Sequence, residues 1–309
     1  MICSLAGALC TLAALFQVES FSALLFWRVC TGFFLAGIYP VGMKIAAQWF
    51  PKGLGVALGW LVGALVLGSA SAHGIRAVSS ELPWSTVMLS VAALAAMGGL
   101  MLYGLVPEPA HKPSQAKQLQ WRALATIWTD RRVRSSVLGY FGHMWELYTL
   151  WVLVPLILAT RFDGTQLSMA AFAVIGVGAL GCILGGLMAQ RWGSAKVASL
   201  QLCISGICCL LAPWLLNAPA IWMMAWLIVW GITVAGDSPQ FSTLTASNAP
   251  PQAVGSILTL TNCIGFGISI VSIELFTSLT ATEALSALLP WLSIGPLLGL
   301  LAMRPLLKI

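Results

Sequence analysis

The sequence predicts an all-α membrane protein, and three observations support this fold class. Of the 309 residues, 59% are hydrophobic and only 8% are charged, whereas a water-soluble domain carries about 25% charged residues. The apolar residues come in repeated stretches of roughly 20 residues, which are long enough to cross about 30 Å of hydrocarbon as helices. Backbone polar groups in lipid need partners within the chain, so a bundle of helices is expected.

Ten apolar stretches are candidates for membrane-spanning helices. In chain order they cover residues 2–18, 22–47, 53–74, 83–105, 135–160, 167–190, 196–216, 219–246, 254–278 and 285–305. A polar stretch rich in Pro, Lys and Arg interrupts the series after the fourth. The sequence therefore predicts three parts, which are a four-helix half over 1–106, a basic cytoplasmic linker over 107–134 and a six-helix half over 135–309.

Basic residues collect on one side of the predicted bundle. If loops alternate sides and the linker is cytoplasmic, twelve of the fifteen Lys and Arg residues lie in cytoplasmic segments. Only Arg76 and Arg161 then lie in external loops. Because Lys and Arg favour the cytoplasmic side of membrane proteins, we expect a multi-pass protein of the cell (inner) membrane with both termini of the chain in the cytoplasm.

Composition and spacing disfavour several other classes of protein. Lys and Arg form no cluster interleaved with aromatic residues, so nucleic acid is not an expected partner. The eight Cys residues lie in apolar stretches without CxxC spacing, so we expect neither a metal site nor a disulfide framework. The three His residues are scattered, which disfavours a membrane-embedded enzyme. We expect a monomer in the lipid bilayer that needs no cofactor.

The two halves repeat each other at an offset of about 199 residues. Gly32 then matches Gly231, and Pro40 matches Pro239. A parallel repeat of this kind is typical of secondary transporters, with the substrate path between the halves. The two spans over 135–190 have no counterpart, so the repeat predicts an architecture of six plus six helices in which the first two are lacking here.

The turn after the sixth predicted span carries a motif, Gly-Leu-Met-Ala-Gln-Arg-Trp-Gly, over residues 186–193, followed by Lys196. It resembles the loop motif G-x-L-A-D-R-x-G-R-R of the major facilitator superfamily, with Gln190 in place of the usual Asp. The resemblance implies a bundle of the superfamily type, with this chain as helices three to twelve. It also implies a role in conformational change for Gly186, Arg191, Gly193 and Lys196.

Two further patterns extend the resemblance. Arg28 begins a run, R-x-x-x-G-x-x-x-A, that resembles the fourth-helix motif of the family. The resemblance implies that Arg28 contacts an anion or a proton in the central path. The alternative is that its side chain extends to the outer lipid headgroups. Residues 59–68 resemble the fifth-helix antiporter motif only in part, because Ala64 stands in place of its Pro. Close helix packing through small residues is sufficient to explain this run.

Ionisable residues inside predicted spans are candidates for function, because charge is costly in the membrane. His143 and Glu146 are three residues apart, which places them on one helix face, with the aromatic Tyr140 and Trp145 nearby. A buried carboxylate beside a His can bind a proton or a cation. The alternative is a structural hydrogen-bonded pair between helices.

A second polar segment lies in the eighth span. Asp237 precedes Pro239, which frees backbone carbonyls that can bond a ligand or a neighbouring helix. The alternative for Asp237 is a pair with a cationic neighbour. Gln240 and Asn262 are further candidates for hydrogen bonds to a polar substrate.

These features together predict a secondary active transporter that moves a small polar or anionic solute by alternating access. Arg28 would attract an anion, while Glu146 and Asp237 are candidate proton carriers for symport. One alternative is an efflux transporter of amphipathic compounds, favoured by the aromatic content. Another is an inactive truncated transporter, and a membrane-embedded enzyme is disfavoured.

Overall fold

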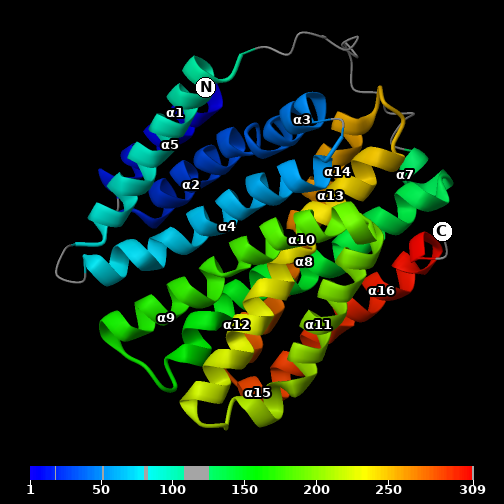
Figure 1. Ribbon diagram of the computed structural model, residues 1–309. Coiled ribbons are helices and arrows are strands. Elements are labelled where there is room, and N and C mark those ends of the chain that lie inside the picture. The colour runs from blue at the N-terminus through cyan, green and yellow to red at the C-terminus, as the bar shows by residue number, and fades with distance from the viewer. Residues whose placement is uncertain (18, 51, 80–82, 108–124, 308–309) are drawn as a thin grey trace.

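The computed structural model describes residues 1–17, 19–50, 52–79, 83–107 and 125–307, and all regular structure within them is helical (Figure 1). The first half contains α1 (Ile2–Leu15), α2 (Phe21–Leu35), α3 (Tyr39–Trp49), α4 (Leu54–Val78) and α5 (Ser85–Leu105). The second half contains α7 (Thr126–Thr129), α8 (Arg131–Leu158), α9 (Gly164–Gly176), α10 (Gly178–Trp192), α11 (Ser194–Leu215), α12 (Ala220–Gly236), α13 (Ser238–Asn248), α14 (Val254–Leu279), α15 (Leu285–Leu288), η1 (Leu289–Ser293) and α16 (Ile294–Leu307).

The prediction of about ten membrane helices is confirmed. Nine helical segments among the described residues are long and apolar enough to cross a membrane, and the shorter α1 is apolar as well. Several predicted spans prove to be two helices in tandem, such as α12 and α13. Residues 108–124 of the predicted linker lie outside the described residues, so the division of the chain at 107–134 stays a prediction.

Two of the broken spans occupy equivalent places in the repeat. The α2–α3 break precedes Pro40, and the α12–α13 break precedes Pro239, 199 residues later. A proline lacks the backbone N–H and its ring clashes with the carbonyl four residues earlier, so the helix ends one turn before it. At the second break the freed carbonyl of Ala235 accepts a hydrogen bond from the Cys182 thiol, at 3.2 Å.

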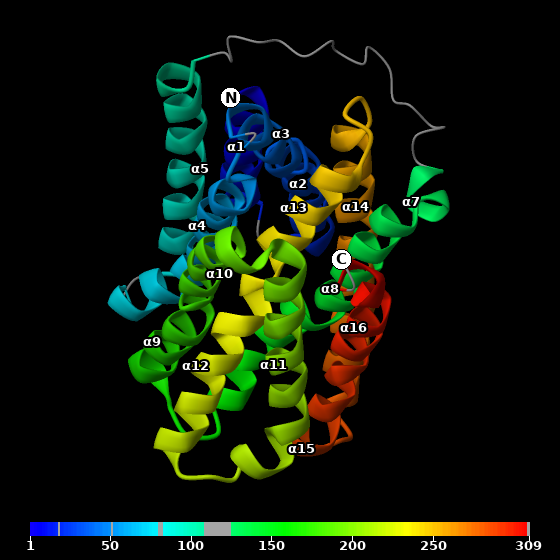
Figure 2. The ribbon, with the colours of Figure 1, turned by 45° about the vertical axis from the view of Figure 1, so that its right-hand side comes forward.

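The two halves meet along α4, which lies against α9 and α10 (Figure 2). Glycines on α4 make this approach possible. A Cβ atom on Gly59 would lie 2.7 Å from the carbonyl oxygen of Cys182, and one on Gly63 would lie 3.2 Å from that of Ala179. Larger side chains would hold the helices apart, so small residues here bring the N-terminal half onto the C-terminal bundle.

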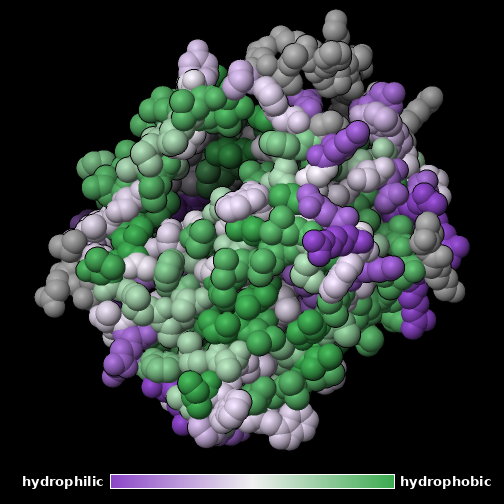
Figure 3. Space-filling view, in the orientation of Figure 1, coloured by the Kyte–Doolittle hydropathy of each residue, from purple (hydrophilic) through white to green (hydrophobic). Residues whose placement is uncertain are grey.

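The exterior is apolar around the middle of the bundle. Hydrophobic residues cover the centre of the visible face, and hydrophilic residues gather toward the right-hand end, where α7 and the end of α16 lie (Figure 3). We call this the basic end. It holds Lys52, Arg131, Arg191 and Arg304, at the starts of α4 and α8 and the ends of α10 and α16. The pattern matches a protein whose sides contact lipid and whose ends contact water.

Candidate functional site

A buried His–Asp pair lies at the centre of the C-terminal half. His143, in the middle of α8, places its Nδ1 atom 2.7 Å from Oδ1 of Asp237, the residue at the α12–α13 break. Both side chains are fully buried. The rings of Tyr140 and Phe241 flank the imidazole, with centroids 5.7 and 6.0 Å away. The proline-induced break therefore supplies the carboxylate that partners a histidine from another helix.

Glu146 occupies a separate set of hydrogen bonds one turn along α8. Its carboxylate accepts bonds from the Trp230 indole N–H at 2.6 Å, the Ser205 hydroxyl at 3.0 Å and the Cys209 thiol at 3.2 Å. These donors come from α12 and α11, and Glu146 is fully buried. The three bonds satisfy a carboxylate without a cationic partner, so Glu146 joins three helices of the C-terminal bundle.

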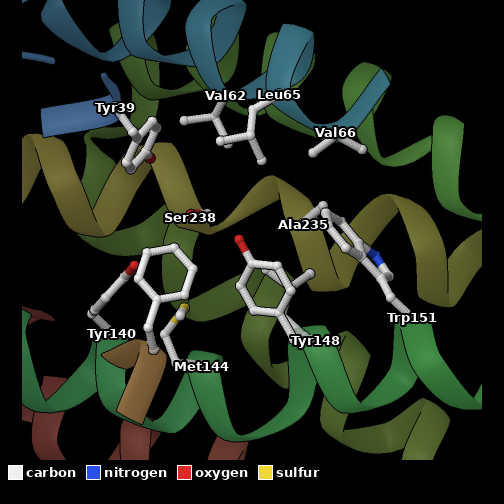
Figure 4. Close-up of a pocket in the computed structure, with 12 residues that line it drawn as sticks. Tyr39, Val62, Leu65, Val66, Tyr140, Met144, Tyr148, Trp151, Ala235 and Ser238 are labelled. Carbon is white, nitrogen blue, oxygen red and sulfur yellow. The ribbon is translucent and has the colours of Figure 1, made fainter. Parts of the chain in front are cut away.

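A narrow pocket lies between the two halves (Figure 4). Its lining includes Tyr140, which flanks His143, and Ser238, which directly follows Asp237. Its twelve lining residues are Tyr39, Val62, Leu65 and Val66 from the N-terminal half and Tyr140, Met144, Leu147, Tyr148, Trp151, Ala235, Ser238 and Phe266 from the C-terminal half. Its volume of about 10 Å³ is close to the minimum that a single water molecule needs. The halves must therefore separate before a solute larger than water can enter.

The pocket presents aromatic faces and hydroxyl groups. Tyr39 begins α3 and Ser238 begins α13, so the two equivalent helix breaks contribute one lining residue each. The Tyr148 ring packs edge-on against Trp151, with centroids 5.1 Å apart. None of the lining residues is charged, although Ser238 directly follows Asp237 and Tyr140 contacts His143. The pocket can thus offer stacking and neutral hydrogen bonds, with a titratable pair behind its wall.

Comparison with known proteins decides the family. A family model described as Major Facilitator Superfamily matches residues 1–273. The chain belongs to the major facilitator superfamily. It is therefore a multi-pass membrane transporter rather than an enzyme, as the sequence predicted.

Solved structures of superfamily members share this fold. The human organic anion transporter MFSD10 (TETRAN) superposes with a TM-score of 0.79 at 17% identity, covering 98% of this chain and 75% of that one. FucP in its outward conformation superposes with a TM-score of 0.70 at 15% identity, covering 97% and 80%. The E. coli fucose:proton symporter FucP, in a variant form, gives 0.65 at 15% identity, covering 98% and 81%. A search of curated protein sequences finds no match.

The other predicted site residues, Trp145, Gln240, Asn262 and Arg28, are not among the residues that line the pocket. Trp145 is not among the pocket-lining residues and packs edge-on against Phe276, at 6.0 Å between centroids. Gln240 and Asn262 are buried, and the Gln240 amide and the Asn262 amide nitrogen have no hydrogen-bond partner. Arg28 is exposed on α2 and does not line the pocket.

The loop motif lies at the basic end of this superfamily fold. A Cβ atom on Gly186 would lie 2.7 Å from the carbonyl oxygen of Gly55 on α4, so this glycine brings the two halves into backbone contact. Gly193 adopts a left-handed conformation, with φ of +81°, which lets α10 turn directly into α11. Arg191 and Lys196 are exposed on either side of this turn.

Several functional-site residues could not be singled out from the sequence. Tyr39 and Tyr148 line the pocket, and Trp230, Ser205 and Cys209 bind Glu146. Cys209 resembles any other small buried residue in an apolar helix. Tyr39 had one available signal, because it lies next to Pro40 in the repeated helix break.

Replacing Glu146 by Gln tests the three-helix junction in this transporter. The amide places an NH₂ group against the donors that now face a carboxylate oxygen, so a buried donor loses its acceptor. We expect a loss of about 1–3 kcal/mol in stability, measured as a lower apparent melting temperature in detergent. The control is Glu274→Gln on α14, where the side chain is exposed. Equal melting temperatures for the two variants would show that the junction adds no stability.

Proposed function

We propose that this chain carries a small polar solute between its two halves by alternating access, and that the His143–Asp237 pair couples transport to protons. The observation that carries the proposal is the position of this buried pair, directly behind an inter-half pocket. Asp and His side chains inside membranes form proton relays in pumps and transporters. Charge in a membrane interior is costly, so the protonation state of the pair biases which arrangement of the halves is stable.

The chemistry of the pocket favours a neutral polar solute over an anion. Its lining offers the hydroxyl groups of Tyr39, Tyr148 and Ser238, and none of its residues is cationic. Arg28, the expected anion contact, lies on the exposed surface of α2 instead. Symport of solute and proton is the form of coupling that we propose, and it is the form named for the structurally similar FucP.

A second candidate is export of amphipathic compounds. It is favoured by the apolar part of the lining, in which Val62, Leu65 and Val66 on α4 face Met144 and Trp151 on α8 (Figure 4). An amphipathic substrate would bury its apolar part against these side chains and direct its polar part to the hydroxyl groups. The two candidates differ in the direction of net transport.

We further propose that the basic end faces the cytoplasm of the inner membrane and that the transporter acts as a monomer. The support for this orientation is the distribution of basic residues, because Arg76 and Arg161 are the two placed toward the opposite end. Labelling of single introduced cysteines near Lys52 and Arg76 with a membrane-impermeant reagent would test the orientation.

Uptake into proteoliposomes tests the proposed function. With an acidic exterior, radiolabelled neutral polar solutes are expected to accumulate above their external concentration, and a proton ionophore should abolish the accumulation. Tyr39→Ala removes one wall of the pocket and is expected to lower uptake about tenfold or more, through lost stacking and hydrogen bonding.

The control for the pocket variant is Trp60→Ala, because Trp60 lies on the same half and is 61% exposed. Its uptake should equal that of the unmodified protein. Equal accumulation of the solute with and without a pH gradient would contradict proton coupling. Extrusion of amphipathic dyes without uptake of polar solutes would favour the second candidate.

A further inference from the structure

Exposed arginines gather where α8 begins and α16 ends. Arg131, Arg132 and Arg134 occupy the first turn of α8, and Arg304 lies in the last turn of α16. All four side chains are exposed. This arginine cluster, defined by these four residues, lies at the basic end and outside the inter-half pocket.

Close packing of α8 on α16 brings the two parts of the cluster together. A Cβ atom on Gly142 would lie 3.0 Å from Cα of Gly299, and one on Gly139 would lie 3.0 Å from Cγ of Met303, the neighbour of Arg304. The helices run antiparallel, so the start of α8 adjoins the end of α16 (Figure 1). The cluster therefore rests on a rigid helix pair.

Among the described residues, no carboxylate forms an ion pair with these four arginines. Asp130 adjoins the cluster, but one oxygen of its carboxylate accepts the backbone N–H groups of Arg132 and Val133, at 2.7 and 3.0 Å, and so caps α8. Within the described part of the chain, the ion pair found is His143–Asp237, which involves none of these arginines. With respect to the residues that the structure describes, the cluster thus presents several guanidinium groups without an acidic partner at the end of a membrane helix.

A tryptophan completes the surface. The Arg134 guanidinium donates to the carbonyl oxygen of Trp128 at 2.9 Å, which fixes the short helix α7 beside α8. Ile127 on α7 is buried, while Trp128 is 57% exposed. Exposed tryptophans at the ends of membrane helices lie at the level of the lipid headgroups. Trp128 therefore places the arginine cluster at headgroup depth.

We propose that the arginine cluster and Trp128 form a binding site for the phosphate-bearing headgroup of an anionic phospholipid. Guanidinium groups donate paired hydrogen bonds that match the geometry of a phosphate. Each basic residue near a membrane surface adds to the attraction for anionic lipid. The bound lipid would connect α7, α8 and α16 at the end of the helix that carries His143.

The test measures lipid binding to the purified transporter in detergent, by native mass spectrometry and by thermal unfolding. Phosphatidylglycerol is expected to stay bound and to raise the apparent melting temperature, whereas phosphatidylcholine should do neither. The triple variant Arg131→Gln/Arg132→Gln/Arg304→Gln is expected to weaken phosphatidylglycerol binding on the order of 100-fold. Arg134 is left unchanged because its side chain holds α7.

Two controls separate this site from general charge effects. Arg76→Gln/Arg161→Gln removes charge at the opposite end and should leave phosphatidylglycerol binding unchanged. The triple Lys variant of the same three arginines keeps the charge but loses the paired guanidinium hydrogen bonds, so its binding should fall between that of the unmodified protein and that of the triple Gln variant. Equal binding of the two lipids, or unchanged phosphatidylglycerol binding in the triple Gln variant, would overturn the proposal. The same stabilisation by inorganic phosphate alone would overturn the assignment to a lipid.

Discussion

Replacing Asp237 by Asn is expected to abolish accumulation driven by a pH gradient, lowering it at least tenfold. Asn has nearly the same shape as Asp, so it can occupy the same place beside Nδ1 of His143. An amide carries no charge and does not take up a proton, so the pair loses the carboxylate to which we assign the coupling. Accumulation into proteoliposomes with an acidic exterior measures the effect. Solute counterflow, which needs no proton movement, should continue.

Three other titratable side chains lie near the pair. Tyr140 flanks His143, Glu146 lies one turn away on α8, and Cys182 donates to Ala235, two residues before Asp237. Asp163→Asn, in the exposed cap of α9, is the matched control and should leave accumulation intact. Full pH-driven accumulation in Asp237→Asn would exclude the pair as the coupling site.

Replacing Gly142 by Val is expected to destabilise the C-terminal half strongly. A Cβ atom at this position would lie 3.0 Å from both N and Cα of Gly299, and it would also clash with the Gly295 carbonyl oxygen. These are backbone atoms of a packed helix and cannot move as a side chain can. We expect a loss of about 3 kcal/mol or more, measured as a lower melting temperature and a smaller folded fraction in detergent.

The control for this substitution is Gly98→Val on α5, where no atom lies within 4 Å of the added Cβ. Both variants replace a helical glycine, so the difference in propensity is the same in each. A melting temperature for Gly142→Val equal to that of Gly98→Val would contradict the close α8–α16 packing.

The fold could be predicted from the sequence because its signal is local. Apolar length identifies the spans, and the match of Pro40 with Pro239 identifies the repeat, whereas the helix breaks before these prolines are seen only in the structure. The contacts of the candidate site, in contrast, join residues that are far apart in the sequence. His143 and Asp237 were identified as separate buried charges, but their pairing across 94 residues depends on the packing of α8 against the α12–α13 break. The spacing of His143 and Glu146 suggested a shared site, yet they bind different partners.

Arg28 belongs to a motif that predicts a place in the central path. The structure shows it exposed on α2, so its role in transport stays a prediction. Only 6% of the apolar window within residues 21–49 is buried, against 67% of the window in α8. Sequence patterns identify which residues are costly in lipid, and only helix packing determines which of them face the pocket.

Cross-linking the two halves across the pocket tests the alternating-access account most directly. In a variant whose reactive cysteines have been replaced, Leu65→Cys and Tyr148→Cys would place one thiol on each side of the pocket for a short bifunctional reagent. The matched pair, Ser4→Cys and Ala95→Cys, joins α1 to α5 within one half, where the Ser4 hydroxyl donates to the Ala95 carbonyl. We predict that the inter-half cross-link abolishes uptake reversibly and that the intra-half one does not. Undiminished uptake with the halves cross-linked would contradict a transport path between them.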